Sequence, residues 1–282
     1  MGKGTLILIG GHEDKEGGKT ILREVARRVG GGKLVVTTVA SHEPDGQFTE
    51  YERIFRSLGV EHVYKLDIRD RLEAKQEAKV RILNDANCIF FTGGDQLKIT
   101  SQIGDTPIFK RIHEIYKDGG IIAGTSAGAS VVCETMVVRG NNDESHRVRS
   151  ALLMAPGLGL IQDVVIDQHF AERGRMGRLI GAIAQNPRNL GIGIDEDTAV
   201  VIEGTDSFYV IGSGAVYVVD GTGVSYSNIA EASPDRTLSI YDLTLHVLCQ
   251  EDCFNLIERR PGELSRSQKK RKLPSDHIPP KE

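Results

Sequence analysis

A serine flanked by small residues is the strongest chemical signal in this chain. The run Gly124-Thr-Ser-Ala-Gly128 follows apolar residues 120–123 and precedes Ala129-Ser-Val-Val-Cys-Glu134. This order predicts a strand, a sharp turn and a helix, with Ser126 at the apex of the turn as a nucleophile. Small neighbours let a strained backbone pass without clashes, and a helix start favours developing negative charge. A serine that merely caps an ordinary helix is the alternative interpretation.

A second glycine turn, Phe91-Thr-Gly-Gly-Asp-Gln96, follows another predicted strand. The carboxyl ends of parallel strands meet at one edge of a sheet, where functional sites tend to form. We therefore expect the backbone of Gly94 and Asp95 to face Ser126 and to form an oxyanion hole together with the N–H of Ala127. A plain strand-to-helix loop explains the same residues equally well.

His169 is the expected general base for this serine, because it ends an apolar run at residues 164–170 and can reach the same edge. A purely structural histidine is the alternative. Three carboxylates in Gly191-Ile-Gly-Ile-Asp-Glu-Asp197 follow another predicted strand, and any of them could orient the imidazole. The order serine, histidine, acid differs from the serine, acid, histidine order of α/β-hydrolases. It suits a class I glutamine-amidotransferase-like fold instead.

The elements that must position these residues follow from hydrophobic periodicity, which predicts strands alternating with helices in the first half of the chain. Short buried strands separated by helices are typical of an α/β fold with a mostly parallel sheet and helices on both faces. The expected strands cover residues 5–9, 33–39, 62–66, 88–91 and 120–123, and the expected helices cover 19–29, 49–58, 71–83 and 108–116.

After residue 163 the pattern changes to closely spaced strands. Glycine, aspartate and serine between these runs suggest β-hairpins added to the edge of the sheet toward the C-terminus. We expect a single domain over residues 1–258 and a basic, disordered tail over residues 259–282, rather than a nucleic-acid or membrane patch. A strand at 164–166 and a helix at 176–184 precede the runs at 191–195, 199–203, 208–211, 215–219 and 238–248.

The composition is that of an ordinary soluble protein, with 39% hydrophobic and 26% charged residues among 282. The formal net charge of −4 provides no field that attracts nucleic acid or anionic membranes. The first apolar run is too short for a signal peptide, and no run reaches the ~18–20 residues of a membrane helix. We expect a cytoplasmic protein that binds neither nucleic acid nor membrane.

The four cysteines suggest no cofactor. Cys88 and Cys133 lie in apolar runs and are expected to be small buried side chains. Cys249 and Cys253 could begin a metal site, but no second pair of ligands completes a tetrahedral set. We therefore expect no bound metal.

Further motifs accompany these residues along the chain. In order, the full set is Gly10-Gly-His-Glu-Asp-Lys15, Phe91-Thr-Gly-Gly-Asp-Gln96, Gly124-Thr-Ser-Ala-Gly-Ala129, Met154-Ala-Pro-Gly157, Asp167-Gln-His-Phe170, Arg173-Gly-Arg-Met-Gly-Arg178 and Gly193-Ile-Asp-Glu-Asp197. Taken together, these motifs resemble those of the cyanophycinases, serine exopeptidases similar to the glutamine-amidotransferase fold with serine in place of cysteine. The run of arginines is the most diagnostic motif, whereas the turn around Ser126 is shared with the related α-aspartyl dipeptidases. His12 stands at a position that varies in the family and receives no role.

The resemblance implies a homodimer in which Ser126 is the nucleophile, His169 the general base and Glu196 the acid that orients it. It also implies the hydrolysis of cyanophycin, a poly-aspartate with arginine amide-linked to each side chain, or of β-Asp-Arg oligomers, to β-Asp-Arg dipeptides. Arginines bind carboxylates through a fork of two N–H groups, and a carboxylate can pair with a substrate guanidinium. A solvated basic turn is the alternative for the arginines. The residues placed around the substrate are Gln96, Asp167, Gln168, Arg173, Arg175 and Arg178.

Two other functions remain open from the sequence. An α-aspartyl dipeptidase or another small-peptide hydrolase on the same fold would use the same three catalytic residues but would leave the arginines without a task. A non-catalytic binding protein would retain the fold, although the presence of serine, histidine and acid in order argues against it.

Overall fold

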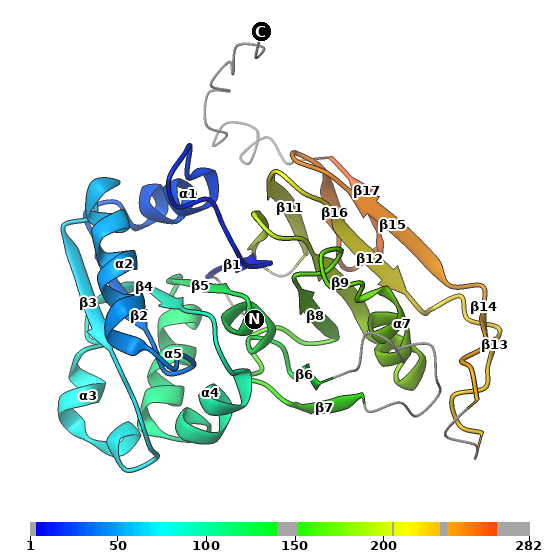
Figure 1. Ribbon diagram of the computed structural model, residues 1–282, viewed down its shortest axis with the longest axis horizontal. Helices are drawn as coiled ribbons and strands as arrows, with labels where there is room; N and C mark the ends of the chain where they lie inside the picture. The colour runs from blue at the N-terminus through cyan, green and yellow to red at the C-terminus, as the bar shows by residue number, and fades with distance from the viewer. Residues whose placement is uncertain (1–3, 140–151, 205, 232–235, 264–282) are drawn as a thin grey trace, which may run out of the picture.

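The computed structural model describes residues 4–139, 152–204, 206–231 and 236–263. Its first half alternates strands and helices as predicted, with one short helix, α4, that the sequence pattern did not indicate (Figure 1). The elements are β1 (Thr5–Ile9), α1 (Thr20–Val29), β2 (Lys33–Thr37), α2 (Pro44–Ser57), β3 (His62–Leu66), a 3-10 turn (Glu73–Lys75), α3 (Glu77–Arg81), β4 (Ala86–Phe91), α4 (Gln96–Ile103), α5 (Pro107–Lys117) and β5 (Ile121–Thr125).

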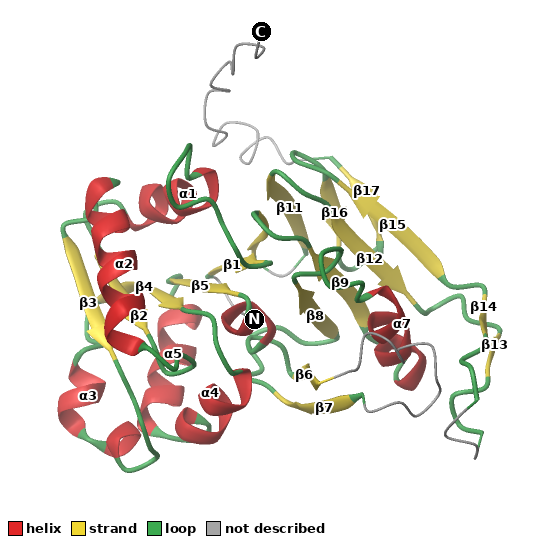
Figure 2. Cartoon of the chain, viewed as in Figure 1, coloured by secondary structure: helices red, strands yellow, loops and turns green. Residues whose placement is uncertain are grey.

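The second half is rich in strands, as Figure 2 shows by colour. The helix predicted after Ser126 is present, but it is a single four-residue turn, so its dipole is small. The elements are α6 (Ala127–Ser130), β6 (Thr135–Arg139), β7 (Leu153–Pro156), β8 (Val164–Gln168), α7 (Met176–Gln185), β9 (Leu190–Ile194), β10 (Thr198–Glu203), β11 (Ser207–Gly212), β12 (Val216–Asp220), β13 (Tyr226–Ser227), β14 (Ile240–Tyr241), β15 (Thr244–Leu248), β16 (Cys253–Asn255) and β17 (Arg260–Gly262).

The main sheet has nine strands in the order β17-β16-β11-β10-β1-β5-β4-β2-β3. Strands β1, β5, β4, β2 and β3 run parallel, which confirms the predicted parallel sheet. The added strands β10, β11, β16 and β17 continue the β1 edge in antiparallel fashion.

Not all of the late strands extend that edge. A second sheet has the order β15-β12-β9-β8, in which β8 and β9 are parallel and β12 is antiparallel to β9. The late strands β10, β11, β16 and β17 thus belong to the main sheet, whereas β8, β9, β12 and β15 form a second layer that packs against it. A separate two-stranded arm, β13 and β14, lies at the edge of the molecule beyond β15 (Figure 1).

Three apolar layers hold these parts together. Helices α1 and α2 cover one face of the parallel strands through residues such as Val25 and Phe55. The other face packs against α5 and also against the second sheet, whose Ile166 and Ile192 belong to the same cluster as Ile122. Helix α7 covers the outer face of the second sheet. Both sheets are therefore buried on the faces that meet, and the ends of β5 and β8 come together between them.

The end of the chain departs from the predicted tail. Strand β17 pairs with β16, and the Arg259 guanidinium bonds Asp220 at 2.7 Å, so ordered structure continues past residue 258. Residues 264–282 of the predicted tail lie outside the described residues. Cys88 and Cys133 are buried and free. Within the described ranges, the chain contains no helix long and apolar enough to cross a bilayer.

Candidate active site

Ser126 lies at a strained turn between β5 and α6. Its backbone has φ 54° and ψ −114°, a conformation that few residues other than glycine adopt, and its N–H is bonded to the Ile9 carbonyl at 2.9 Å. The small neighbours are required here. A Cβ on Gly124 would lie 2.3 Å from the Gly128 carbonyl, and a Cβ on Gly128 would lie 2.5 Å from the Phe91 carbonyl. The turn thus projects Ser126 from the end of the parallel sheet, as the motif predicts.

His169 meets this serine from the second sheet, one residue after the end of β8. Its Nε2 lies 2.9 Å from the Ser126 Oγ, and its Nδ1 lies 2.5 Å from Oε1 of Glu196. The His169 backbone N–H donates to the Gly10 carbonyl at 2.8 Å. Gly11 packs against the imidazole itself, since a Cβ on Gly11 would lie 2.3 Å from the ring. The turn after β1 therefore forms a wall that holds the base in place.

Of the three adjacent carboxylates, only that of Glu196 contacts the histidine. The Asp195 side chain accepts hydrogen bonds from the backbone N–H groups of Ala171 and Ala215, at 2.9 and 3.1 Å. Asp197 accepts from the Asp14 N–H at 2.8 Å and from the Ser213 hydroxyl at 2.7 Å. Both aspartates thus fasten loops together. The structure brings Ser126, His169 and Glu196 into one hydrogen-bonded chain.

The protonation of this chain suits a neutral imidazole. Burial lowers the pKa of His169, partly opposed by its bond to Glu196, while the nearby charge of Arg173 lowers it further. For Glu196, burial raises the pKa, but hydrogen bonds with His169 and His12 outweigh burial and leave the pKa lowered. At neutral pH the site therefore holds a neutral base beside a charged carboxylate.

The predicted oxyanion donors divide into two groups. The Asp95 N–H is already bonded to the Ala40 carbonyl at 3.0 Å, and the Asp95 carboxylate caps α4 by accepting from the Leu97 N–H at 2.8 Å. Asp95 is thus committed to the start of α4, and its prediction as a donor is wrong for this structure. Within the described part of the chain, the backbone N–H groups of Gly94 and Ala127 donate to no backbone carbonyl. These two remain the candidate donors.

Asp167, Arg175 and Arg178 form a buried ion cluster behind His169. Asp167 is 1% exposed, and the arginines are 7% and 6% exposed. Arg178 Nε lies 2.5 Å from one Asp167 carboxylate oxygen, and Arg175 Nη1 lies 3.2 Å from the other. Burial lowers the pKa of Arg175 to about 10, so it remains charged at neutral pH. Because both arginines are ion-paired with Asp167, direct substrate contact through them, as predicted, would require breaking a buried pair.

Gln168, Gln96 and Arg173 occupy different positions relative to Ser126. The Gln168 side-chain oxygen accepts from Arg175 at 2.9 Å and lies 3.4 Å from the Ser126 Oγ, so the ion cluster positions it at the nucleophile. Gln96 is buried and donates to the Val137 carbonyl at 3.0 Å, which fastens α4 to β6. Arg173 is exposed and close enough to His169 to affect its pKa. Contact of these three with substrate stays a prediction.

Two features of the site were missed by sequence reasoning. His12 reaches the second oxygen of Glu196, with Nδ1 2.9 Å from Oε2, across 184 residues of sequence. The buried carboxylate of Glu13 accepts from the hydroxyl of Thr125 at 2.6 Å and from that of Tyr51, and so fastens α2 to the turn before Ser126. The run Gly10–Lys15 was singled out only through the family resemblance. No local signal indicates what its side chains contact.

The site can be compared with proteins of known family. Residues 6–210 match peptidase family S51. The chain is 42% identical to the cyanophycinase of Synechococcus elongatus over 257 residues, which cover 90% of this chain and 80% of that one. It is 41% identical to the cyanophycinase of Nostoc sp., over 91% of this chain and 87% of that one, and 38% identical to that of Geminocystis herdmanii, over 92% and 96%.

Solved structures share the fold at lower identity. A peptidase from an acI-B1 actinobacterium superimposes with a TM-score of 0.62 at 24% identity, over 86% of this chain and 97% of that one. A putative peptidase E protein from Listeria monocytogenes gives a TM-score of 0.52 at 17% identity, over 75% and 99%. At these identities the likeness concerns the fold alone, and it agrees with the predicted α/β class.

Proposed function

Since the chain belongs to peptidase family S51, a family of serine-type peptidases, we propose that it hydrolyses cyanophycin to β-Asp-Arg dipeptides through Ser126, His169 and Glu196. The observation that carries the proposal is the chain of contacts from the Ser126 Oγ through both nitrogens of His169 to Glu196. A nucleophile, a base and an orienting carboxylate in this order are the parts that acyl transfer requires.

In the proposed reaction the Ser126 Oγ attacks the carbonyl carbon of the scissile amide, and His169 Nε2 takes the hydroxyl proton. The charge that develops on the carbonyl oxygen is stabilised by the N–H groups of Gly94 and Ala127. His169 then protonates the leaving amine, which departs and leaves an acyl-enzyme. Water activated by the same imidazole hydrolyses the ester and restores Ser126. Glu196 keeps the proton of His169 on Nδ1 and stabilises the imidazolium that forms.

The cyanophycin substrate is supported by the relatives and by the charges around the site. Curated cyanophycinases are 38–42% identical to this chain over at least 90% of its length. Arg173 is exposed beside His169 and supplies a charge that could bind a substrate carboxylate. Arg175 and Arg178 are buried, so we assign them a positioning role that acts on substrate through Gln168.

The test is an assay of purified protein with cyanophycin, (β-Asp-Arg) oligomers and plain aspartyl dipeptides, with products identified by mass spectrometry. We expect β-Asp-Arg as the product and far slower hydrolysis of Asp-Leu-type dipeptides. A Ser126→Ala protein serves as the control for contaminating peptidases. Hydrolysis of the dipeptides in preference to cyanophycin would overturn the substrate assignment and leave a dipeptidase that uses the same residues.

We also propose a cytoplasmic homodimer. All four cysteines are free, which agrees with a reducing compartment. The edge strand β15 exposes Leu245 and Val247, at 47% and 58%, and Tyr241 nearby is 56% exposed. Apolar residues along an open strand edge are typical of a contact surface. Light scattering should give twice the chain mass, and Val247→Glu should reduce it to one chain.

A further inference from the structure

Two histidines, not one, contact the carboxylate of Glu196. His169 Nδ1 lies 2.5 Å from one oxygen, and His12 Nδ1 lies 2.9 Å from the other. The two imidazole rings meet edge to face, with centroids 5.1 Å apart. The proposed reaction uses only the first contact. The second brings a further nitrogen, on a side chain that is 71% exposed, to the outer side of the site.

We propose that Zn²⁺ binds between His12, His169 and Glu196 and inhibits the enzyme reversibly. One ligand atom from each residue lies within 4.8 Å of the other two. Two imidazole nitrogens and one carboxylate oxygen form a frequent three-residue zinc set, and water completes the tetrahedron.

Only small movements are needed to admit the ion. Zinc–ligand bonds of about 2.0–2.2 Å in a tetrahedral site place the ligand atoms roughly 3.3–3.5 Å apart. The two contacts to Glu196, at 2.5 and 2.9 Å, must therefore widen by less than about 1 Å while the imidazoles approach each other. His12 is largely exposed and the Glu196 side chain is 25% exposed, so both can move. His169 is held by Ser126 and Gly11 and supplies the fixed ligand.

The inhibition follows from the tautomer of His169. In the active form the proton sits on Nδ1, facing Glu196, and the lone pair of Nε2 accepts the Ser126 proton. Zinc on Nδ1 occupies the lone pair there, so the single proton of the neutral ring must move to Nε2. His169 then cannot accept a proton from Ser126. Loss of the Glu196 contact adds to the effect, because that carboxylate is now a zinc ligand.

Charges around the site both favour and oppose the ion. Glu196 carries the negative charge of the ligand set, and the Glu172 carboxylate accepts a bond from the Glu196 N–H at 3.3 Å. The positive charge of Arg173 opposes zinc binding, since it lies close enough to act on His169, one of the ligands. We therefore expect a reversible site of moderate affinity rather than a permanently bound ion.

The binding half of the proposal is tested without catalysis, so its failure is distinct from failure of the proposed function. Isothermal titration calorimetry of Ser126→Ala protein with zinc chloride should show one ion per chain. Adding His12→Asn should weaken binding at least roughly tenfold. Asparagine tolerates the positive φ of His12, 46°, and His12→Ala provides a second variant. The matched controls His62→Asn and Cys249→Ser, at exposed positions elsewhere, should bind as tightly as Ser126→Ala alone.

The inhibition half is tested on active protein with cyanophycin, and only this half rests on the proposed function. Zinc should inhibit wild type and EDTA should restore its rate. His12→Asn should need at least roughly tenfold more zinc for half inhibition, measured against its own zinc-free rate. No binding by calorimetry, or binding that His12→Asn leaves unchanged, would overturn the site. Binding without inhibition would overturn the tautomer argument.

Discussion

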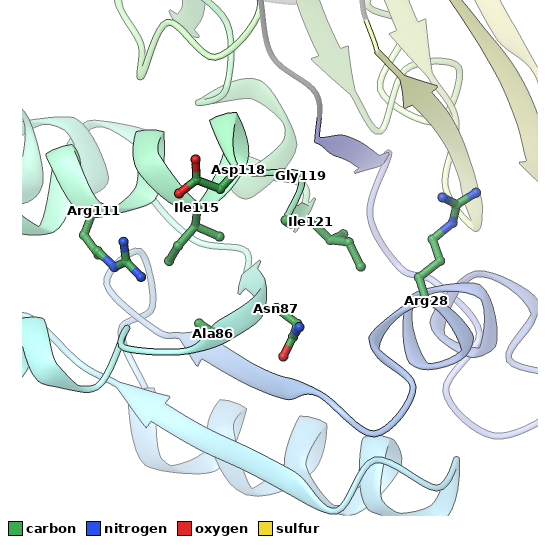
Figure 3. Close-up of a pocket in the computed structure, with 9 residues that line it drawn as sticks. Arg28, Ala86, Asn87, Arg111, Ile115, Asp118, Gly119 and Ile121 are labelled. Atoms are coloured by element: carbon green, nitrogen blue, oxygen red, sulfur yellow. The ribbon is translucent and has the colours of Figure 1, made fainter.

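The two ends of the parallel strands hold different kinds of polar groups. At the carboxyl ends of β5 and β8, Ser126 and His169 face each other across 2.9 Å. At the amino ends of β4 and β5 lies a hollow whose lining includes Arg28, Asn87 and Arg111 (Figure 3). The Arg28 guanidinium is bonded to Glu203 at 2.7 Å, and Arg111 is bonded to Glu114 at 3.0 Å. The hollow is polar, but both of its arginines already have carboxylate partners.

The difference between the two ends shows that a polar hollow is not enough to form a catalytic site. At the carboxyl ends, the backbone of Ser126 and His169 is held at φ 54° and 47° by bonds to Ile9 and Gly10 on the neighbouring strand and the turn after it. These strained conformations place the reactive side chains of the two sheets next to each other. The opposite hollow requires no such convergence, and nothing in it forms a chain from nucleophile to base.

The largest contrast between the two ends is expected from removal of the nucleophile. Ser126→Ala should lower kcat by roughly 10⁴–10⁶-fold, because no other group can form the acyl-enzyme. Arg111→Gln, in the opposite hollow, should change kcat less than about twofold, as for a solvated surface pair. Steady-state assays and circular dichroism on both variants provide the measurement. Equal losses in the two variants would contradict the comparison.

The buried charges behind the active site should differ from exposed ones in stability rather than in binding. Arg178→Ala leaves Asp167 with Arg175 as its one charged partner and should lower the free energy of unfolding by about 3–5 kcal/mol. Arg173→Ala, on the exposed turn, should cost under ~1 kcal/mol. Urea denaturation measures both. If Arg178→Ala instead keeps full stability and raises KM tenfold, then Arg178 binds substrate directly, as the sequence suggested.

Two glycines with similar backbones sharpen the comparison further. Gly11 (φ 109°) abuts the His169 ring, whereas Gly119 (φ 98°), in the opposite hollow, has open space at its missing Cβ. Both alanine variants strain the backbone, but only Gly11→Ala should also displace the base. We expect roughly 10²-fold loss of kcat for Gly11→Ala, typical of a misplacement near 1 Å, and full activity per folded molecule for Gly119→Ala. Similar kcat values would mean that the wall behind His169 is dispensable.

The smallest effect concerns pH. Catalysis needs neutral His169, and its pKa lies below the ordinary histidine value because of burial and the charge of Arg173. Activity should therefore persist below pH 6.5 and fall only as the pH drops through this lowered pKa. Arg173→Gln removes one cause and should move the acid limb of kcat toward higher pH. An unchanged or lower limb would show that Arg173 does not act on the base.

The local parts of this architecture could be predicted, and the long-range parts could not. Ser126 was evident because strand, turn and small residues are adjacent in sequence. The assignment of β9 and β10 to different sheets was not, because both are short buried runs only a few residues apart and read as a hairpin. Helix α4 was missed because only Gln96, Ile99 and Ile103 of its eight residues are buried, which leaves little periodicity. Its cap, Asp95, was the available signal.

The same limit applies within the candidate site. The sequence left three carboxylates as partners for His169, and only the resemblance singled out Glu196. Asp195 is unavailable to the imidazole because its carboxylate accepts hydrogen bonds from the backbone N–H groups of Ala171 and Ala215, which are distant in sequence. The burial of Arg175 and Arg178 is likewise set by the packing of α7 against the second sheet, which a run of arginines in the sequence does not indicate.

Strand β1 pairs on one side with β5 and on the other with β10, so its neighbours are made at very different times during synthesis. The parallel half is complete once β5 has left the ribosome, yet its β1 edge stays open until residues 198–203 arrive. Ser126 is likewise translated before His169 and Glu196. During the same interval the nascent chain therefore contains Ser126 without its base and the β1 edge without its neighbouring strand. Glu196 and β10, which covers that edge, are synthesised at almost the same time. A truncated chain that ends before Glu196, and therefore also lacks β10, should be both inactive and prone to aggregate.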